Sequence, residues 1–135
     1  MTIEEKIQRA LGARVAALVL SPPLIVAWPN NVTAVSPPYL RVDYFPNRSQ
    51  RIGIKGSSPH RRLGILQITV VAPLNVGPDR SVAIAGLVAE HFPADLVLTY
   101  DGVDVRIFKA PDVLPANKED ASWDVPVSIE YESFS

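Results

Sequence analysis

The segment Ile65–Ala72 constrains the fold more than any other part of the sequence. It reads Ile-Leu-Gln-Ile-Thr-Val-Val-Ala, so nearly every side chain is apolar or β-branched and suits a pleated sheet. A strand that is apolar on both sides is covered on both faces. We therefore expect a central strand that ends at Pro73.

A helix is predicted at the start of the chain. Thr2 and Glu5 have the spacing of a capping box, in which the two side chains satisfy orphan backbone N–H groups. An apolar stripe at helical spacing follows; it consists of Ile3, Ile7, Leu11, Val15 and Leu18. Pro22 and Pro23 end this helix by Ser21 at the latest.

A second helix is predicted from Pro78 to about Phe92, because proline is favoured in the first helical turn. Pro93 stops it. Its expected apolar stripe is Val82, Ala85, Ala89 and Phe92.

The remaining apolar segments read as strands. Leu24–Trp28 is short and extended, and Tyr39–Phe45 alternates between two faces. Asp101-Gly102 supplies the positive φ angles of a two-residue turn, so Leu96–Tyr100 and Val103–Phe108 form a hairpin.

The chain ends in an alternating strand around Val125–Tyr131. Pro126 lacks an N–H group, which favours a sheet edge for this strand. The segment Pro111–Ser122 is predicted to be a polar loop.

These elements predict an α+β fold in a single domain spanning residues 1–135. We expect a mostly antiparallel sheet with two helices packed on one face and a protruding basic loop or hairpin arm. Trp28 and Trp123 flank loops and are expected to anchor the core.

The arm is predicted at about residues 46–62. Pro46–Pro59 has few apolar side chains and cannot build a core of its own. Loops of this length in compact domains tend to be functional or disordered. The candidate partner-binding residues are Arg48, Arg51, Lys55, Arg61 and Arg62. They suit an acidic partner, and the alternative is a solvated loop that keeps the protein soluble.

Charge is unevenly distributed along the chain, although the net charge is −1. Residues 41–62 carry six basic side chains against one acidic side chain, a net of +5. Residues 79–135 carry four basic and eleven acidic side chains, a net of −7. A chain of this kind can be complementary to copies of itself.

The sequence gives little support for catalysis or for a cofactor. There is no cysteine, and His60 and His91 lack the ligand spacing of a zinc site. Neither a Gly-x-Ser-x-Gly elbow nor a phosphate-binding loop is present. We expect no enzyme activity, no cofactor and two surface histidines.

A membrane span or a targeting segment is not expected either. Glu4 and Glu5 have the wrong charge for the start of a signal peptide, and Pro22-Pro23 interrupts the apolar stretch Ala16–Trp28. The expectation is a soluble intracellular protein that makes no membrane contact.

Three segments resemble a known family. They are Pro59–Val71 (Pro-His-Arg-Arg-Leu-Gly-Ile-Leu-Gln-Ile-Thr-Val-Val), Pro38–Val42 (Pro-Tyr-Leu-Arg-Val) and Trp123–Ile129 (Trp-Asp-Val-Pro-Val-Ser-Ile). With the opening helix and the arm, the chain resembles the small phage tail-terminator-like (tail-completion) proteins of long-tailed phages and prophages. The resemblance carries no catalytic or binding residues over to this chain.

The resemblance implies a structural virion protein that is assembled in the host cytoplasm. Such subunits form a hexameric ring that caps the tail tube, ends its polymerisation and provides the head-joining surface. The implied partners are further copies of the chain, the tail tube protein and a head-completion protein, with passing contact with DNA.

Two alternatives remain at this point. One is another head–tail connector or minor tail protein that binds a partner without forming a ring. The other is a nucleic-acid-binding module that uses the basic arm. It is the weaker alternative because no aromatic residues interleave with the basic residues between Pro46 and Arg62.

Overall fold

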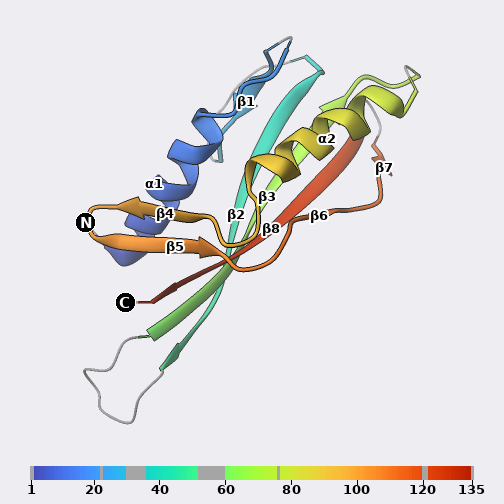
Figure 1. Ribbon diagram of the computed structural model, residues 1–135. Coiled ribbons are helices and arrows are strands. Elements are labelled where there is room, and N and C mark those ends of the chain that lie inside the picture. The colour runs from blue at the N-terminus through green and yellow to red at the C-terminus, as the bar shows by residue number, and fades with distance from the viewer. Residues whose placement is uncertain are drawn as a thin grey trace.

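Two helices lie on one face of a curled, mostly antiparallel sheet (Figure 1). The computed structural model describes residues 2–21, 23–29, 36–51, 60–75, 77–119 and 122–134, of which 47–51 are described in the backbone alone. Within these residues the strand order is β1-β2-β3-β8-β5-β4, and β6 and β7 pair with β8 beside this path. The predicted α+β class and the helices on one face are confirmed.

The helices and strands follow one another in an order close to the predicted one. Their bounds are α1 (Ile3–Ala16), β1 (Ile25–Ala27), β2 (Tyr39–Arg51), β3 (His60–Ala72), α2 (Asp79–His91), β4 (Val97–Tyr100), β5 (Val103–Ile107), β6 (Asp112–Val113), β7 (Asn117–Lys118) and β8 (Trp123–Phe134).

Strand β3 is central, as its composition predicts. It is antiparallel to β2 on one side and to β8 on the other, so that Leu66 lies between Tyr44 and Ile129. On the helix side, Leu66, Ile68 and Val70 are 0% exposed. On the opposite side, Thr69 and Val71 are also buried, which explains why the segment is apolar or β-branched on both faces.

Helix α1 begins where the capping pattern places it. The backbone N–H of Glu5 donates to Thr2 Oγ1 at 3.2 Å. The buried residues Ile7, Ala10, Leu11 and Val15 form its inner face. The helix ends at Ala16, before the proline pair.

Helix α2 has the predicted bounds to within one residue, but its predicted stripe is partly wrong. The side chain of Val82 is 52% exposed, whereas Ser81, Ile84, Ala85 and Val88 are buried. The segment Ser81–Ala89 has no charged residue, so its hydrophobicity pattern does not distinguish the inner face from the outer one.

The hairpin between β4 and β5 is confirmed. Asp101 and Gly102 have φ values of 46° and 80°. A two-residue turn in which both central residues have positive φ angles matches the twist of the two flanking strands. The short strand β1 pairs with Tyr39–Arg41 of β2 in parallel.

The last strand is not at an edge, so that expectation is wrong. Strand β8 lies between β3 and the row formed by β5, β6 and β7. The carbonyl of Pro126 accepts from the backbone N–H of Leu114 at 2.8 Å, so it points away from β3. The N–H and C=O of one strand residue point the same way, so the missing N–H of Pro126 weakens only its pairing with the short segment around β6.

The prediction that Pro111–Ser122 is a loop without strands is also wrong. Within it, β6 and β7 pair with β8 as two short strands. Segments of two residues lack the alternation on which a strand prediction depends.

The arm is a continuation of the β2–β3 hairpin, which projects away from the helices (Figure 1). The two strands pair as far as Arg51 and His60, with a register shift between Pro46 and Arg48. The hairpin form of the arm is thus confirmed for its base. Residues 52–59 lie outside the described part of the chain.

Gly64 leaves the space that the Tyr131 ring occupies at the base of the arm. The two residues are direct partners across β3 and β8, and a Cβ atom on Gly64 would overlap the ring and hydroxyl of Tyr131. Burial is the main reason that the pKa of Tyr131 is raised to about 12. The aromatic ring therefore covers a glycine in the middle of the sheet.

We predict that Gly64→Ala lowers the free energy of unfolding by about 1–3 kcal/mol, because the buried ring must move. Gly86→Ala is the matched control, since nothing lies within 4 Å of the Cβ position there. That control is expected to stabilise α2 by about 0.5–1 kcal/mol. Chemical denaturation measures both, and equal stability of the two variants would contradict the assignment.

Candidate partner-binding surface

Four of the five predicted binding residues lie on the two strands of the arm. Arg48 and Arg51 are on β2, where only the backbone is described, and Lys55 lies outside the described residues. Arg61 and Arg62 lie at the start of β3. The topology therefore places Arg48, Arg51, Arg61 and Arg62 on paired strands of one hairpin.

Arg61 makes contacts within the subunit that the sequence did not reveal. Its Nε atom donates to Glu132 Oε2 at 2.8 Å, and the NH2 group lies 2.7 Å from the same oxygen. The guanidinium also lies over the ring of Phe108, 5.6 Å from the ring centre. These contacts tie the base of the arm to β8 and to the end of β5.

Glu132 is the centre of a wider ionic network. Its side chain is 5% exposed, and its Oε1 atom accepts from Arg106 NH1 at 3.0 Å. Arg106 reaches in turn to Asp95, 2.6 Å away. A buried carboxylate requires partners of this kind, because isolated burial of a charge is very costly. Glu132 is therefore a structural anchor for both arginines.

Arg62 is engaged with α1. Its NH1 group lies 2.6 Å from Glu4 Oε1. Side chains at the beginning of the chain and at the start of β3 are thus joined, and the N-terminus of α1 lies beside the arm. Both guanidinium side chains retain some exposure, at 34% for Arg61 and 25% for Arg62.

The charge asymmetry of the sequence is partly neutralised inside one subunit. Arg61 pairs with Glu132, and Arg41 NH1 lies 3.7 Å from Asp124 Oδ2. Both pairs join the basic middle of the chain to its acidic end.

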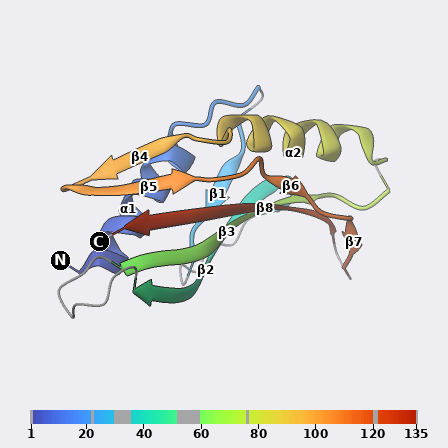
Figure 2. The same cartoon turned by 60° about the horizontal axis from the view of Figure 1, so that its bottom comes forward.

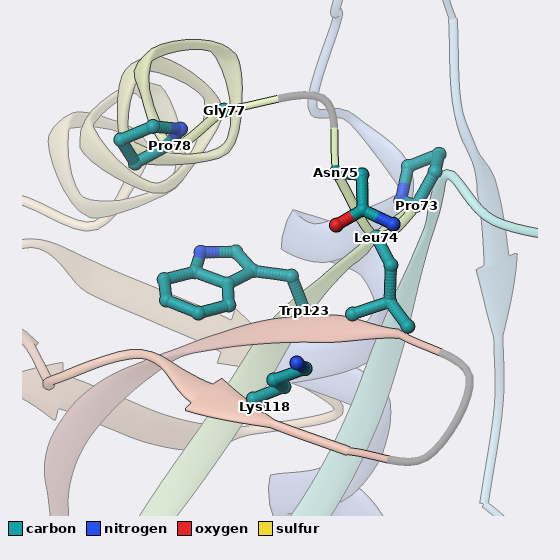
Figure 3. Close-up of a pocket in the computed structure, with 7 residues that line it drawn as sticks. All are labelled: Pro73, Leu74, Asn75, Gly77, Pro78, Lys118 and Trp123. Carbon is teal, nitrogen blue, oxygen red and sulfur yellow. The ribbon is translucent and has the colours of Figure 1, made fainter.

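A separate pocket of about 270 Å³ lies at the opposite end of β3 (Figure 3). Its apolar wall includes the indole ring of Trp123, which packs against the core. The indole N–H of Trp123 is buried without a hydrogen-bond partner among the described residues, and positions 120 and 121 beside it are not described. The pocket is lined by Pro73, Leu74, Asn75, Gly77, Pro78, Lys118 and Trp123.

The histidines do not form a metal site in the described part of the chain, where no group of three ligating side chains is found. His91 lies at the junction of the two helices. Its Nε2 atom is 2.7 Å from the carbonyl oxygen of Arg14, while Arg14 Nε and NH2 donate to the carbonyl of His91. His91 is partly buried and has a structural role, which the surface interpretation did not predict.

A model of a protein family described as phage tail terminator protein matches residues 6–131. The chain belongs to the phage tail terminator family. Membership makes the protein a structural component of a phage tail, in a family whose members contact other tail or head proteins. The resemblance inferred from the sequence is thereby confirmed.

A solved structure supports the same fold. It has a TM-score of 0.76 and a sequence identity of 27%, over 96% of this chain and 94% of the other. A search of curated proteins finds no match.

In the ranges that are described, no helix is long and apolar enough to cross a membrane.

We predict that Glu132→Gln lowers the free energy of unfolding by about 2 kcal/mol, because two charge-assisted contacts lose their acceptor charge in a buried place. Glu119→Gln is the control, because Glu119 is exposed and its backbone N–H bonds to the carbonyl oxygen of Ser122. Thermal and urea unfolding measure the difference. A Glu132→Gln variant as stable as the control would show that the network does not hold the arm.

Proposed function

We propose that the protein forms a ring that caps the tail tube, ends tube polymerisation and provides the surface to which the head is joined. The observation that carries this proposal is the family match, which extends over residues 6–131 and leaves little of the chain for another role. Assembly would take place in the host cytoplasm, before the tail is joined to the head.

A hexamer is the proposed form of the ring. A closed ring needs a heterologous contact, in which one surface of a subunit meets a different surface of the next. The basic arm and the acidic carboxyl-terminal half of the chain offer surfaces of opposite sign. Because some of these charges are already paired within the subunit, the contact depends on the charges that remain.

The arm is proposed to bind an acidic surface of the tail tube protein. Arg48, Arg51 and Lys55 would supply the contact along the outer part of the arm. Arg61 and Arg62 would contribute at its base, where their side chains remain partly exposed. The ion pairs between Glu132 and Arg61 and between Glu4 and Arg62 would then fix the orientation of the arm relative to the rest of the subunit.

The other face of the ring would receive a head-completion protein, and DNA would pass through the ring when it leaves the joined particle. The basic arm has two candidate partners in this arrangement, protein and nucleic acid. Salt dependence separates them, because each phosphate contact releases counterions and steepens the dependence.

Ring formation is tested by light scattering behind size exclusion over a range of concentrations, with and without tail tube protein. We expect a single oligomer with the mass of six subunits, and shorter tubes when the protein is added during tube polymerisation. A chain that stays monomeric with and without tubes, and leaves tube length unchanged, would contradict the proposal.

We predict that the triple variant Arg48→Ala, Arg51→Ala, Lys55→Ala binds tail tubes about tenfold more weakly, as expected for three exposed ion pairs of about 0.5 kcal/mol each. The control replaces Ser49, Ser57 and Ser58 of the same arm with alanine. Sedimentation with tubes measures the binding. Equal binding by the two variants would exclude the arm charges from the tube contact, and steep salt-dependent DNA binding lost in the first variant alone would favour the nucleic-acid alternative.

A further inference from the structure

The sheet has two open edges at opposite ends of its strand order. Strand β4 is the last strand on one side, and no further strand pairs with it among the described residues. On the other side, β1 covers β2 only along Tyr39–Arg41. Figure 2 shows β4 and β2 on opposite sides of the sheet, separated by β5, β8 and β3. Open edges of this kind accept further strands.

The two edges have matching lengths. Among the residues that the structure describes, no strand pairs with this side of β2 from Val42 onward, and Pro46 interrupts the edge because it has no N–H to donate. The register shift between Pro46 and Arg48 also bends the strand there. The usable segment is therefore Val42–Phe45, and β4 itself spans Val97–Tyr100, so each edge offers four residues.

Strand direction also fits a continuous sheet. From β2 to β4 the path crosses four antiparallel pairings, β2–β3, β3–β8, β8–β5 and β5–β4, so that β2 and β4 run in the same direction. If a second copy is related to the first by rotation about an axis that runs along the strands, β4 of one copy is parallel to β2 of the other. Strand β1 already runs parallel to β2 on that side, and an incoming β4 would continue its line.

The faces of the sheet restrict the register. Phe45 pairs with Ile65, Val97 pairs with Arg106, and the pairs that join them across the sheet put Phe45 and Val97 on the face opposite the helices. Residues that lie directly opposite each other on neighbouring strands have their side chains on the same face of the sheet, and this also applies to strands from two subunits. With Val97 opposite Asp43, Thr99 lies opposite Phe45, and three residues of each four-residue segment are paired. Phe45 and Val97 are 49% and 51% exposed, so the junction would cover apolar surface from both edges.

Charge complementarity identifies the occupant as another copy of this chain. In this register the Asp101 turn that follows β4 falls beside Asn47 and Arg48 at the base of the basic arm. The side chain of Asp101 is 66% exposed, and that of Asp95, just before β4, is 75% exposed. Within the subunit Asp101 pairs with Lys6 at 3.3 Å and Asp95 pairs with Arg106 at 2.6 Å, so only the exposed outer sides of these two carboxylates are available to the basic part of the neighbouring strand.

We propose that the subunits of the ring join edge to edge, with the β4 edge of one copy adding in parallel to Val42–Phe45 of β2 in the next. This inference rests on the proposed ring. The junction is short, so Asp101 and the arginines of the arm select the register and the partner. Because the two edges differ, an open row of joined subunits has an unpaired β4 edge at one end and an unpaired β2 edge at the other. These two edges pair when the ring closes.

The natural absence of cysteine allows a direct test. The double variant Phe45→Cys, Thr99→Cys is treated with a short bifunctional thiol reagent and examined on a denaturing gel. The matched control is Phe45→Cys, Val82→Cys, whose second cysteine replaces a side chain that is 52% exposed on α2. A second pair from the same register, Asp43→Cys with Val97→Cys, guards against a variant that fails to assemble.

We expect a ladder of linked subunits from either edge pair and none beyond the dimer from the control or from single cysteines. Light scattering on the natural chain keeps the two proposals separate. If the natural chain forms rings and neither edge pair gives a ladder, or the control gives an equal one, the edge junction is overturned and the ring stands. If the natural chain stays monomeric and no ladder forms, both are overturned.

Discussion

The pairing of β3 with two neighbours along nearly its whole length is the constraint on which the rest of the molecule depends. In its second half, the side chains that face the helices and those on the opposite face are both buried. Its first half leaves the core and continues into the arm with β2. One strand therefore belongs both to the core and to the arm, and the direction of the arm is determined by the packing of the core.

The ionic contacts at the base of the arm extend this constraint. Glu132 on β8 holds Arg61 of β3 and Arg106 of β5, and Glu4 of α1 holds Arg62. Three elements of the body are thus joined to the arm where it leaves the core. The cost of burying the Glu132 carboxylate is offset only while both arginines stay in place, so the network favours one arm position over others. The charges of Arg61 and Arg62 at the base of the arm thus contribute to the fold of the subunit.

Local signals in the sequence predicted much of the fold. The Thr2 cap, the Asp101-Gly102 turn and the apolar run of β3 act through neighbours in the chain, and the structure confirms all three. The errors concern pairing between distant segments. Pro126 indicated an edge, yet its missing N–H faces a segment that pairs only briefly. The partners of Arg61 lie 71 and 47 positions further along the chain, at Glu132 and Phe108, so no local pattern could reveal them. The basic character of the arm was visible in the sequence, but the ion pairs of Arg61 and Arg62 within the subunit were not.

The two open edges of the described sheet are unlike each other, and both are short. An exposed edge strand normally invites uncontrolled pairing, and natural proteins limit it with proline, bulges and short strands. This chain has all three: Pro46 and the register shift shorten the β2 edge, and β4 is only four residues long. The pairing that remains is too brief to be stable alone, because parallel pairing of a few residues contributes little. In the proposed ring several such junctions would form together, and closure would leave no edge unpaired.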